Sequence, residues 1–164
     1  MLVTVIQLIA VLIPLAGLIA LLQGKHRSNS AFLLMLTTVG CLILNCGYLM
    51  LITATDAATA MLGIKAEVLG NSVFFFFFVL FLLSYLKLHV PRSLLYGWAA
   101  LEIIYVTAFW VDSLRESLFG GFGFYNHDKL NIMLAHNEHS ELYMTHTAFL
   151  ALLIAGCTCY LIVL

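Results

Sequence analysis

A single carboxylate stands in the middle of an otherwise apolar run. Glu102 lies near the centre of the segment from Ser93 to Val111. A charged group at that depth in a membrane is costly and must face the protein interior or a water-filled cavity. Glu102 could therefore be a proton-sensitive or ligand-pairing group, or a protonated acid hydrogen-bonded to a neighbouring helix. The other polar side chains in apolar segments, which we expect to join helices by hydrogen bonds, are Gln7, Asn45 and Asn71.

Two opposite charges open the third apolar segment. Lys65 and Glu67 are two residues apart, so on a helix they project to different faces and do not pair with each other. One interpretation is that both line an outward-facing pocket. The other is that they snorkel at the membrane surface, with the charge in water and the stem along apolar surface.

Histidines and carboxylates are dense before the last apolar segment. His136, Glu138, His139 and Glu141 lie close together, with His146 further on. Such side chains could bind a divalent transition metal or titrate near neutral pH. Their spacing matches no established ligand signature, so we predict a solvated polar segment and no bound metal or cofactor.

Complete catalytic motifs are absent. The sequence has no phosphate-cradling glycine loop, no HExxH and no GxSxG. No basic tract is available for nucleic acid, and the formal net charge is -1. We therefore predict neither an enzyme nor a nucleic-acid-binding protein. The cysteines lie in apolar segments without any CxxC pair and are predicted to be packing residues: Cys41, Cys46, Cys157 and Cys159.

The elements that position these residues are apolar helices. The chain is 63% hydrophobic and only 9% charged over 164 residues, whereas soluble domains are about 25% charged. Because a spanning helix needs ~20 apolar residues, we predict an all-α membrane protein with five spans in an antiparallel bundle. The spans run from Leu2 to Leu22, Ala31 to Ala54, about Ala60 to Leu86, Ser93 to Val111, and about Thr145 to Leu164.

The basic residues predict the orientation. Lys25 and Arg27 lie between the first two spans, and Lys87 and Arg92 between the third and fourth, without any acid beside them. The long connection from Asp112 to Tyr143 is acidic. Since lysine and arginine favour the cytoplasmic side, we expect the N-terminus and the long connection outside the cell.

The long connection has the pattern of a β-hairpin. Phe122 alternates with Phe124, and Leu130 with Ile132 and Leu134, around a turn at Asn126-His127-Asp128. An apolar hairpin outside the membrane must pack on something, so we predict a short extracytoplasmic lid between the fourth and fifth spans. The last residues, Tyr160 to Leu164, are apolar without a polar flank. We therefore expect residues 1–164 to be one transmembrane domain cut from a longer one.

The third span carries a family resemblance. The stretch Ala60 to Gly70, with Lys65, Glu67, Leu69 and Gly70, and the closing connection with Pro91, resemble the N-terminal seven-helix region of bacterial membrane histidine kinases and diguanylate cyclases. Gly47-Tyr48 and the stretch His139 to Ala148 are similar to it as well. The chain departs from the family pattern at Asn71-Ser72, where a proline is common, and at Ser140-Glu141, which replace a glycine-proline.

The resemblance implies a sensory input domain in the bacterial cytoplasmic membrane. Such a domain would detect an extracytoplasmic or membrane ligand, a small molecule or a peptide, and signal to a cytoplasmic kinase or cyclase domain in cis, usually as a homodimer. The alternative is a transport or channel subunit with a polar midplane pathway at Glu102. Our candidate ligand-binding residues are Lys65, Glu67, Glu102 and His146, with Phe122, Phe124 and Tyr125 above them.

Overall fold

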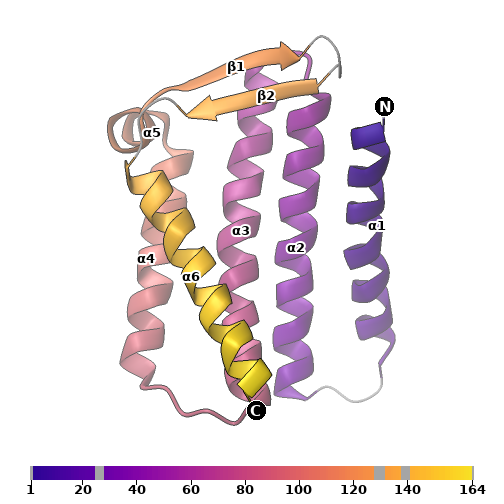
Figure 1. Cartoon of the computed structure of the whole chain (residues 1–164), viewed down its shortest axis with the longest axis vertical. Helices are drawn as coiled ribbons and strands as arrows, with labels where there is room; N and C mark the ends of the chain where they lie inside the picture. Colours follow the sequence, from indigo (N-terminus) through magenta and orange to yellow (C-terminus); the bar gives the residue numbers. More distant parts are fainter. Residues whose placement is uncertain (1, 25–27, 128–131, 138–140, 164) are drawn as a thin grey trace.

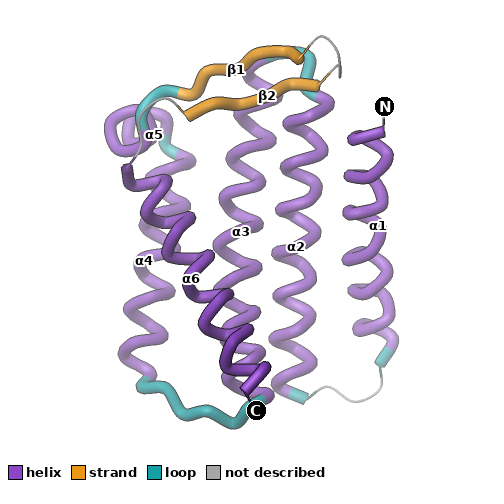
Figure 2. The backbone as a smooth tube through the Cα atoms, in the orientation of Figure 1, coloured by secondary structure: helices purple, strands orange, loops and turns teal. Residues whose placement is uncertain are grey.

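The computed structural model describes residues 2–24, 28–127, 132–137 and 141–163. In chain order the elements are α1 (Leu2–Gln23), α2 (Asn29–Thr53), α3 (Ala57–Tyr85), α4 (Arg92–Trp110), α5 (Asp112–Phe119), β1 (Phe122–His127), β2 (Ile132–Asn137) and α6 (Glu141–Val163). Four long helices stand side by side in chain order, α6 runs obliquely over α4 and α3, and the two strands lie across one end (Figure 1). The N-terminus is at the strand end and the C-terminus at the opposite end (Figure 2).

Four helices among the described residues are long and apolar enough to cross a membrane. They are α1 to α4, with 22, 25, 29 and 19 residues. At ~1.5 Å per residue, even α4 is about as long as the hydrocarbon core is thick. In α6, the apolar stretch that is described runs over Met144–Leu153. The chain is thus a multi-pass, mostly helical membrane protein with a small sheet.

The helix starts follow from local side-chain chemistry. Ser28 Oγ accepts a hydrogen bond from the Ala31 backbone N–H at 3.1 Å, and Asp56 Oδ1 accepts one from the Thr59 backbone N–H at 2.8 Å. These oxygens satisfy N–H groups that have no partner within the helix, which fixes where α2 and α3 begin. Only residues 54–56 separate α2 from α3, so the two helices are antiparallel neighbours.

Glycines let α2 and α3 touch backbone to backbone. Gly40 and Gly47 on α2 and Gly63 and Gly70 on α3 are each seven residues apart. A Cβ added at Gly70 would lie 2.2 Å from the Leu44 backbone nitrogen, and at the other three glycines 2.5–2.7 Å from backbone atoms. Small residues of this kind allow close helix approach in membranes, where packing rather than water drives association. The α2–α3 contact is accordingly the most extensive in the fold.

The predicted hairpin is present, with one correction: Asn126 and His127, which the sequence placed in the turn, belong to β1. β1 and β2 pair antiparallel, with Phe124 opposite Ala135 and Tyr125 opposite Leu134. On β2 the residues that pack against the core with Phe122 and Phe124 are Met133 and Ala135. The register decides this, because residues opposite Phe124 share its face and a shift of one residue reverses every side chain.

The core lies beneath the hairpin. Phe109 of α4 and Phe119 of α5 are fully buried, and they pack with Ile64 and Val68 of α3. Helix α5 was not expected from the sequence. Gly120 ends it with a φ of 74°, a conformation that favours glycine. The chain thereby turns from α5 into β1 above the end of the bundle.

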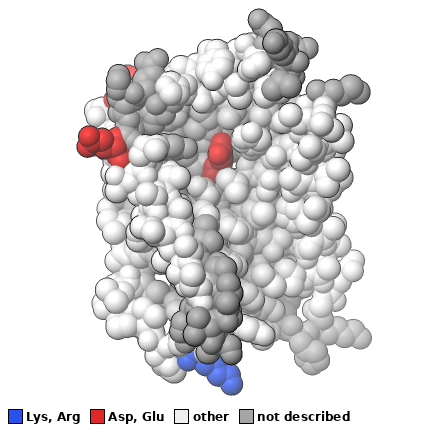
Figure 3. All heavy atoms as spheres, in the orientation of Figure 1, with Lys and Arg blue, Asp and Glu red and all other residues white. Residues whose placement is uncertain are grey.

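Charged residues separate between the two ends. Acidic groups lie toward the hairpin end and basic groups at the opposite end of the face seen in Figure 3. Lys87 and Arg92 flank the connection from α3 to α4 and are exposed. Lys25 and Arg27, the other two residues in the orientation argument, lie outside the described residues.

Candidate functional site

An outer cavity lies at the hairpin end of the bundle. Its volume is about 890 Å³, within the size range of small-molecule sites. Helix α3 contributes Lys65, α5 contributes Arg115, and β1 contributes Phe122 and Phe124. Gly120 and the adjoining glycine complete the wall between α5 and β1. Asp112 and Glu116 line it as well, so the cavity combines two cationic and two acidic groups with two aromatic rings.

An ion cluster holds the cationic side of this outer cavity. Asp112 Oδ1 accepts hydrogen bonds from Lys65 Nζ at 2.8 Å and from Arg115 Nη1 at 2.7 Å. Arg115 also lies 3.7 Å from the Glu116 carboxylate. The hydrogen bond and the positive charge of Lys65, with a smaller effect of Arg115, lower the pKa of Asp112. Lys65 and Arg115 are mostly buried while Asp112 is exposed, so the cluster ties α3 to α5 at the cavity edge.

A second polar group is buried between α4 and α6. The Glu102 side chain accepts a hydrogen bond from Trp98 Nε1 at 2.9 Å, and His146 Nε2 lies 3.3 and 3.2 Å from its two oxygens. The His146 ring stacks on Tyr105 with ring centroids 3.6 Å apart. Glu102 is only 7% exposed. This meets the requirement that a carboxylate at this depth faces the protein interior with partners.

Glu67 lies on the other side of α3 from Lys65. It borders a small cleft that also contains Asn71 and His146. The predicted divergence of Lys65 and Glu67 is confirmed, since Lys65 pairs with Asp112 and not with Glu67. His146 of α6 therefore lies between two carboxylates: it is within hydrogen-bonding distance of Glu102 and borders the same cleft as Glu67.

Aromatic rings connect the outer cavity to the buried pair. Phe122 of the hairpin contacts Phe109 with centroids 5.6 Å apart, and Phe109 contacts Phe119 at 5.2 Å. Phe119 then contacts Tyr105 at 5.3 Å, in edge-to-face geometry. Tyr105 stacks on His146, as described above. The three contacts among the phenylalanine and tyrosine rings lie in the range of favourable aromatic pairs, and the Tyr105–His146 stack is closer, at 3.6 Å. The rings therefore form an unbroken line of packing.

The structure divides the predicted site residues into two groups. Lys65, Phe122 and Phe124 line the outer cavity. Inside the bundle, Glu102 and His146 are hydrogen-bonded to each other, and Glu67 borders the same cleft as His146. Tyr125 does not line the cavity: it is 54% exposed and projects from the opposite face of β1 to Phe122 and Phe124.

Several residues of both groups were not identified from the sequence. Asp112 and Arg115 are three residues apart, a spacing that favours pairing on a helix, but α5 itself was not expected. Trp98 is four residues before Glu102, and that spacing could have indicated its role. Tyr105 carried no comparable signal, because its stacking depends on the path of α6.

Other predicted polar residues behave as expected or stay predictions. Gln7 Nε2 donates to the backbone oxygen of Asn45 at 3.0 Å and to Asn45 Oδ1 at 3.1 Å, which confirms a hydrogen-bonded link from α1 to α2. His136 is exposed on β2. Glu138 and His139 lie outside the described residues, so the expectation of no metal there stays a prediction.

These features define a class of protein. Long apolar helices enclose a hydrogen-bonded carboxylate and imidazole, and a cavity lined by charged and aromatic side chains lies at one end, which is the organisation of a multi-pass membrane protein. The chain belongs to the family described as the N-terminal 7TM region of histidine kinase, whose model matches residues 4–164. Neither a curated protein nor a solved structure matches the chain.

Proposed function

We propose that this domain is the ligand-detecting input module of a membrane histidine kinase. In this proposal α6 is the fifth spanning helix, residues 1–164 form one part of a seven-helix domain, and the hairpin is an extracytoplasmic lid. The N-terminus and hairpin are outside the cell. Family membership supports the sensory role, and the acidic hairpin end opposite the basic connection supports the orientation.

The outer cavity is the observation that carries the ligand proposal. A small molecule or peptide there would contact the Phe122 and Phe124 rings, while Lys65 and Arg115 would favour an anionic or hydrogen-bond-accepting group. Such a ligand would compete with Asp112 for both cations. Binding would therefore loosen the tie between α3 and α5. The remaining candidate residues then influence signalling without contacting the ligand: Glu67, Glu102, His146 and Tyr125.

The aromatic line supports a route from the cavity to the helices. Phe122 is the hairpin end of that line and His146 the α6 end. A displacement of the hairpin would repack α4 against α6 and so bias the output domain in cis, a histidine kinase or, by the sequence resemblance, a diguanylate cyclase. The coupling requires the ligand to bind two packing arrangements unequally. Signalling as a homodimer belongs to the same proposal.

A transport or channel role is not favoured. Glu102 is engaged by Trp98 and His146 instead of standing in a continuous polar path. The larger space beside Glu102 is walled chiefly by apolar side chains. The family is a kinase input region.

Chemical filling of the outer cavity tests the proposal. In the full-length protein without its native cysteines, Ala58→Cys puts a thiol on the cavity wall, Ser117→Cys puts one on the exposed surface of α5, and Leu88→Cys puts one at the opposite end of the bundle. Right-side-out vesicles are treated with a membrane-impermeant cationic methanethiosulfonate. Kinase autophosphorylation and the extent of labelling are measured for each variant.

We expect the reagent to label the Ala58 and Ser117 variants from outside and the Leu88 variant only after permeabilisation. Autophosphorylation should change severalfold for the Ala58→Cys adduct and stay unchanged for the Ser117→Cys adduct. Labelling of the Leu88 variant from outside would overturn the orientation. Complete labelling of the Ala58 variant with unchanged autophosphorylation would overturn the cavity as the signal input.

A further inference from the structure

The charged side chains of the outer cavity balance one another. Lys65 and Arg115 supply two positive charges, and Asp112 and Glu116 supply two negative charges. The two cationic side chains are only 15% and 10% exposed, so each needs a carboxylate partner whether or not a ligand is bound. The acidic side chains are 69% and 72% exposed. A ligand that enters this set of charges must therefore supply an anion without leaving the acids unbalanced.

The ion cluster already has the geometry of a carboxylate site. Lys65 Nζ and Arg115 Nη1 both donate to one oxygen, Asp112 Oδ1, at 2.8 and 2.7 Å. The two nitrogens thus converge on a single carboxylate, and a ligand carboxylate that takes this place keeps both cations paired. Asp112 then remains beside the incoming anion, with Glu116 on the same helix. An ammonium group on the ligand offsets the repulsion, because it pairs with the two acids.

The remaining wall of the outer cavity is mainly apolar. Helix α3 contributes Met61 with Ala57 and Ala58, and β1 contributes the rings of Phe122 and Phe124. Aromatic pairs and contacts between a methionine sulfur and a ring are both favourable. The volume of about 890 Å³ leaves ample space for a large side chain. These residues therefore favour an aromatic group on the same ligand.

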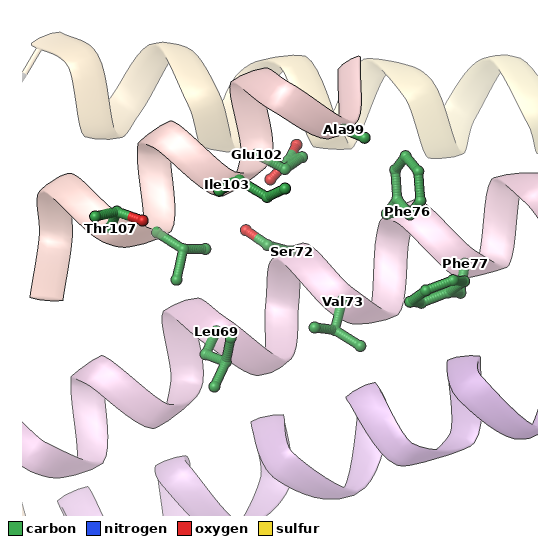
Figure 4. Close-up of a pocket in the computed structure, with 10 residues that line it drawn as sticks. Leu69, Ser72, Val73, Phe76, Phe77, Ala99, Glu102, Ile103 and Thr107 are labelled. Carbon is green, nitrogen blue, oxygen red and sulfur yellow. The ribbon is translucent and has the colours of Figure 1, made fainter. Parts of the chain in front are cut away.

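The cavity between α3 and α4 has no comparable set of charges. Hydrocarbon side chains such as Val73 and Phe76 predominate in its lining (Figure 4). Glu102 is the one charged residue among its described lining residues, and it is already hydrogen-bonded to Trp98 and His146. A ligand with charges of both signs therefore fits the outer cavity and not this one.

We propose that the outer cavity binds a free α-amino acid with an aromatic side chain. Its carboxylate binds Lys65 and Arg115, its ammonium group pairs with Asp112 and Glu116, and its ring packs against the two phenylalanines of β1. The acids and cations of the cavity are in contact, which suits a ligand whose two charged groups are joined to one carbon. Each added peptide residue would separate these groups by up to ~3.5 Å. This inference rests on the proposed function, because it names the ligand class of the same cavity.

Equilibrium binding of radiolabelled L-phenylalanine to the full-length protein in phosphatidylcholine nanodiscs tests this inference. Three competitors each lack one part of the ligand: 3-phenylpropanoate the ammonium group, 2-phenylethylamine the carboxylate, and glycine the side chain. Phenylalanyl-phenylalanine keeps all three parts but separates the charges. Glu116→Gln removes one acid from the cavity, and Glu141→Gln, at an exposed glutamate of α6 outside the cavity, is the matched control. The methanethiosulfonate adducts of Ala58→Cys and Ser117→Cys locate the binding site.

We expect unlabelled phenylalanine to displace the label at a concentration about tenfold lower than any competitor, the loss that one charge-assisted hydrogen bond represents. Glu116→Gln should weaken phenylalanine binding about threefold, as expected for an exposed ion pair, without weakening that of 3-phenylpropanoate. Glu141→Gln should change neither. The adduct of Ala58→Cys should abolish phenylalanine binding, and the adduct of Ser117→Cys should leave it intact.

Equal competition by phenylalanine and either singly charged analogue would overturn the inference, and so would binding that survives full labelling of Ala58→Cys. Absence of saturable phenylalanine binding at millimolar concentrations would also overturn it. If the Ala58→Cys adduct still changes autophosphorylation in that case, the cavity remains the signal input and only its ligand class is wrong. If phenylalanine binds but the fully labelled Ala58→Cys variant keeps its autophosphorylation, the proposed function fails instead.

Discussion

Replacing Gly70 by alanine should weaken the α2–α3 pair more than any comparable change in the bundle. The added Cβ would lie 2.2 Å from the Leu44 backbone nitrogen, whereas ordinary van der Waals contact begins near 3.4 Å. Because the obstacle is backbone and not a flexible side chain, the helices must separate by about 1 Å, which is the difference between those two distances. A gap of 0.5–1 Å already forfeits about a quarter to a half of the dispersion attraction of each contact. Overpacking of this kind costs about 1–3 kcal/mol.

A matched control is available within the same fold. Gly97 is in the interior of α4, and a Cβ added there would meet nothing within 4 Å. Gly97→Ala should be neutral or slightly stabilising, since alanine favours helix over glycine by up to about 1 kcal/mol in soluble hosts. Reversible unfolding by sodium dodecyl sulfate in mixed micelles, followed by far-ultraviolet circular dichroism, measures both free energies. If Gly70→Ala unfolds at the same detergent fraction as Gly97→Ala, backbone contact between α2 and α3 is not what holds the pair together.

Three further predictions concern polar contacts. In a double-mutant cycle of Glu102→Ala and His146→Ala, unfolding free energies should reveal a coupling of about 0.5–2 kcal/mol; strict additivity would mean that the pair makes no net contribution. In carbon-13 NMR spectra the Asp112 carboxyl should titrate below its ordinary pKa of about 3.9, and its pKa should rise in Lys65→Met, because Lys65 favours the charged form of Asp112. Any stability that the ionised Asp112 contributes is complete above the ordinary pKa and is lost only as the pH falls through the lower folded-state pKa. A change in stability between pH 5 and 8 must therefore have another source. Gln7→Leu should lower the unfolding free energy by about 0.6 kcal/mol, the mean value of such interhelical bonds, and an unchanged midpoint of detergent unfolding would show that the link from α1 to α2 is dispensable.

The sequence was most informative where one residue type is costly in a membrane. Glu102 could be identified because a carboxylate in an apolar run needs an explanation, and Gln7 with Asn45 for the same reason. The partner of Glu102 could not be named, because His146 reaches it only through the oblique path of α6 across α4. That path is a property of the packed bundle and has no signature in the residues themselves.

Local patterns were less reliable at the hairpin. The alternation of Phe122 with Phe124 and of Ile132 with Leu134 correctly predicted two strands, but the turn signal at Asn126 and His127 lies within β1. Met133 and Ala135 take the core side because pairing with β1 fixes the register. The glycines at positions 40, 47, 63 and 70 had a regular spacing in the sequence, yet only the backbone approach in the structure explains what that spacing does.

The same four glycines determine which parts of the bundle are mechanically stiff. Sliding α2 along α3 by one turn, about 5.4 Å, would bring side chains to places where only a hydrogen fits, so this pair behaves as a fixed frame. Helix α3 has far less contact with α4 and α6 than with α2. The hairpin packs on this frame, because β2 contacts α2. Helices α4 and α6 are less tightly packed against the frame, and the line of aromatic rings ends between them.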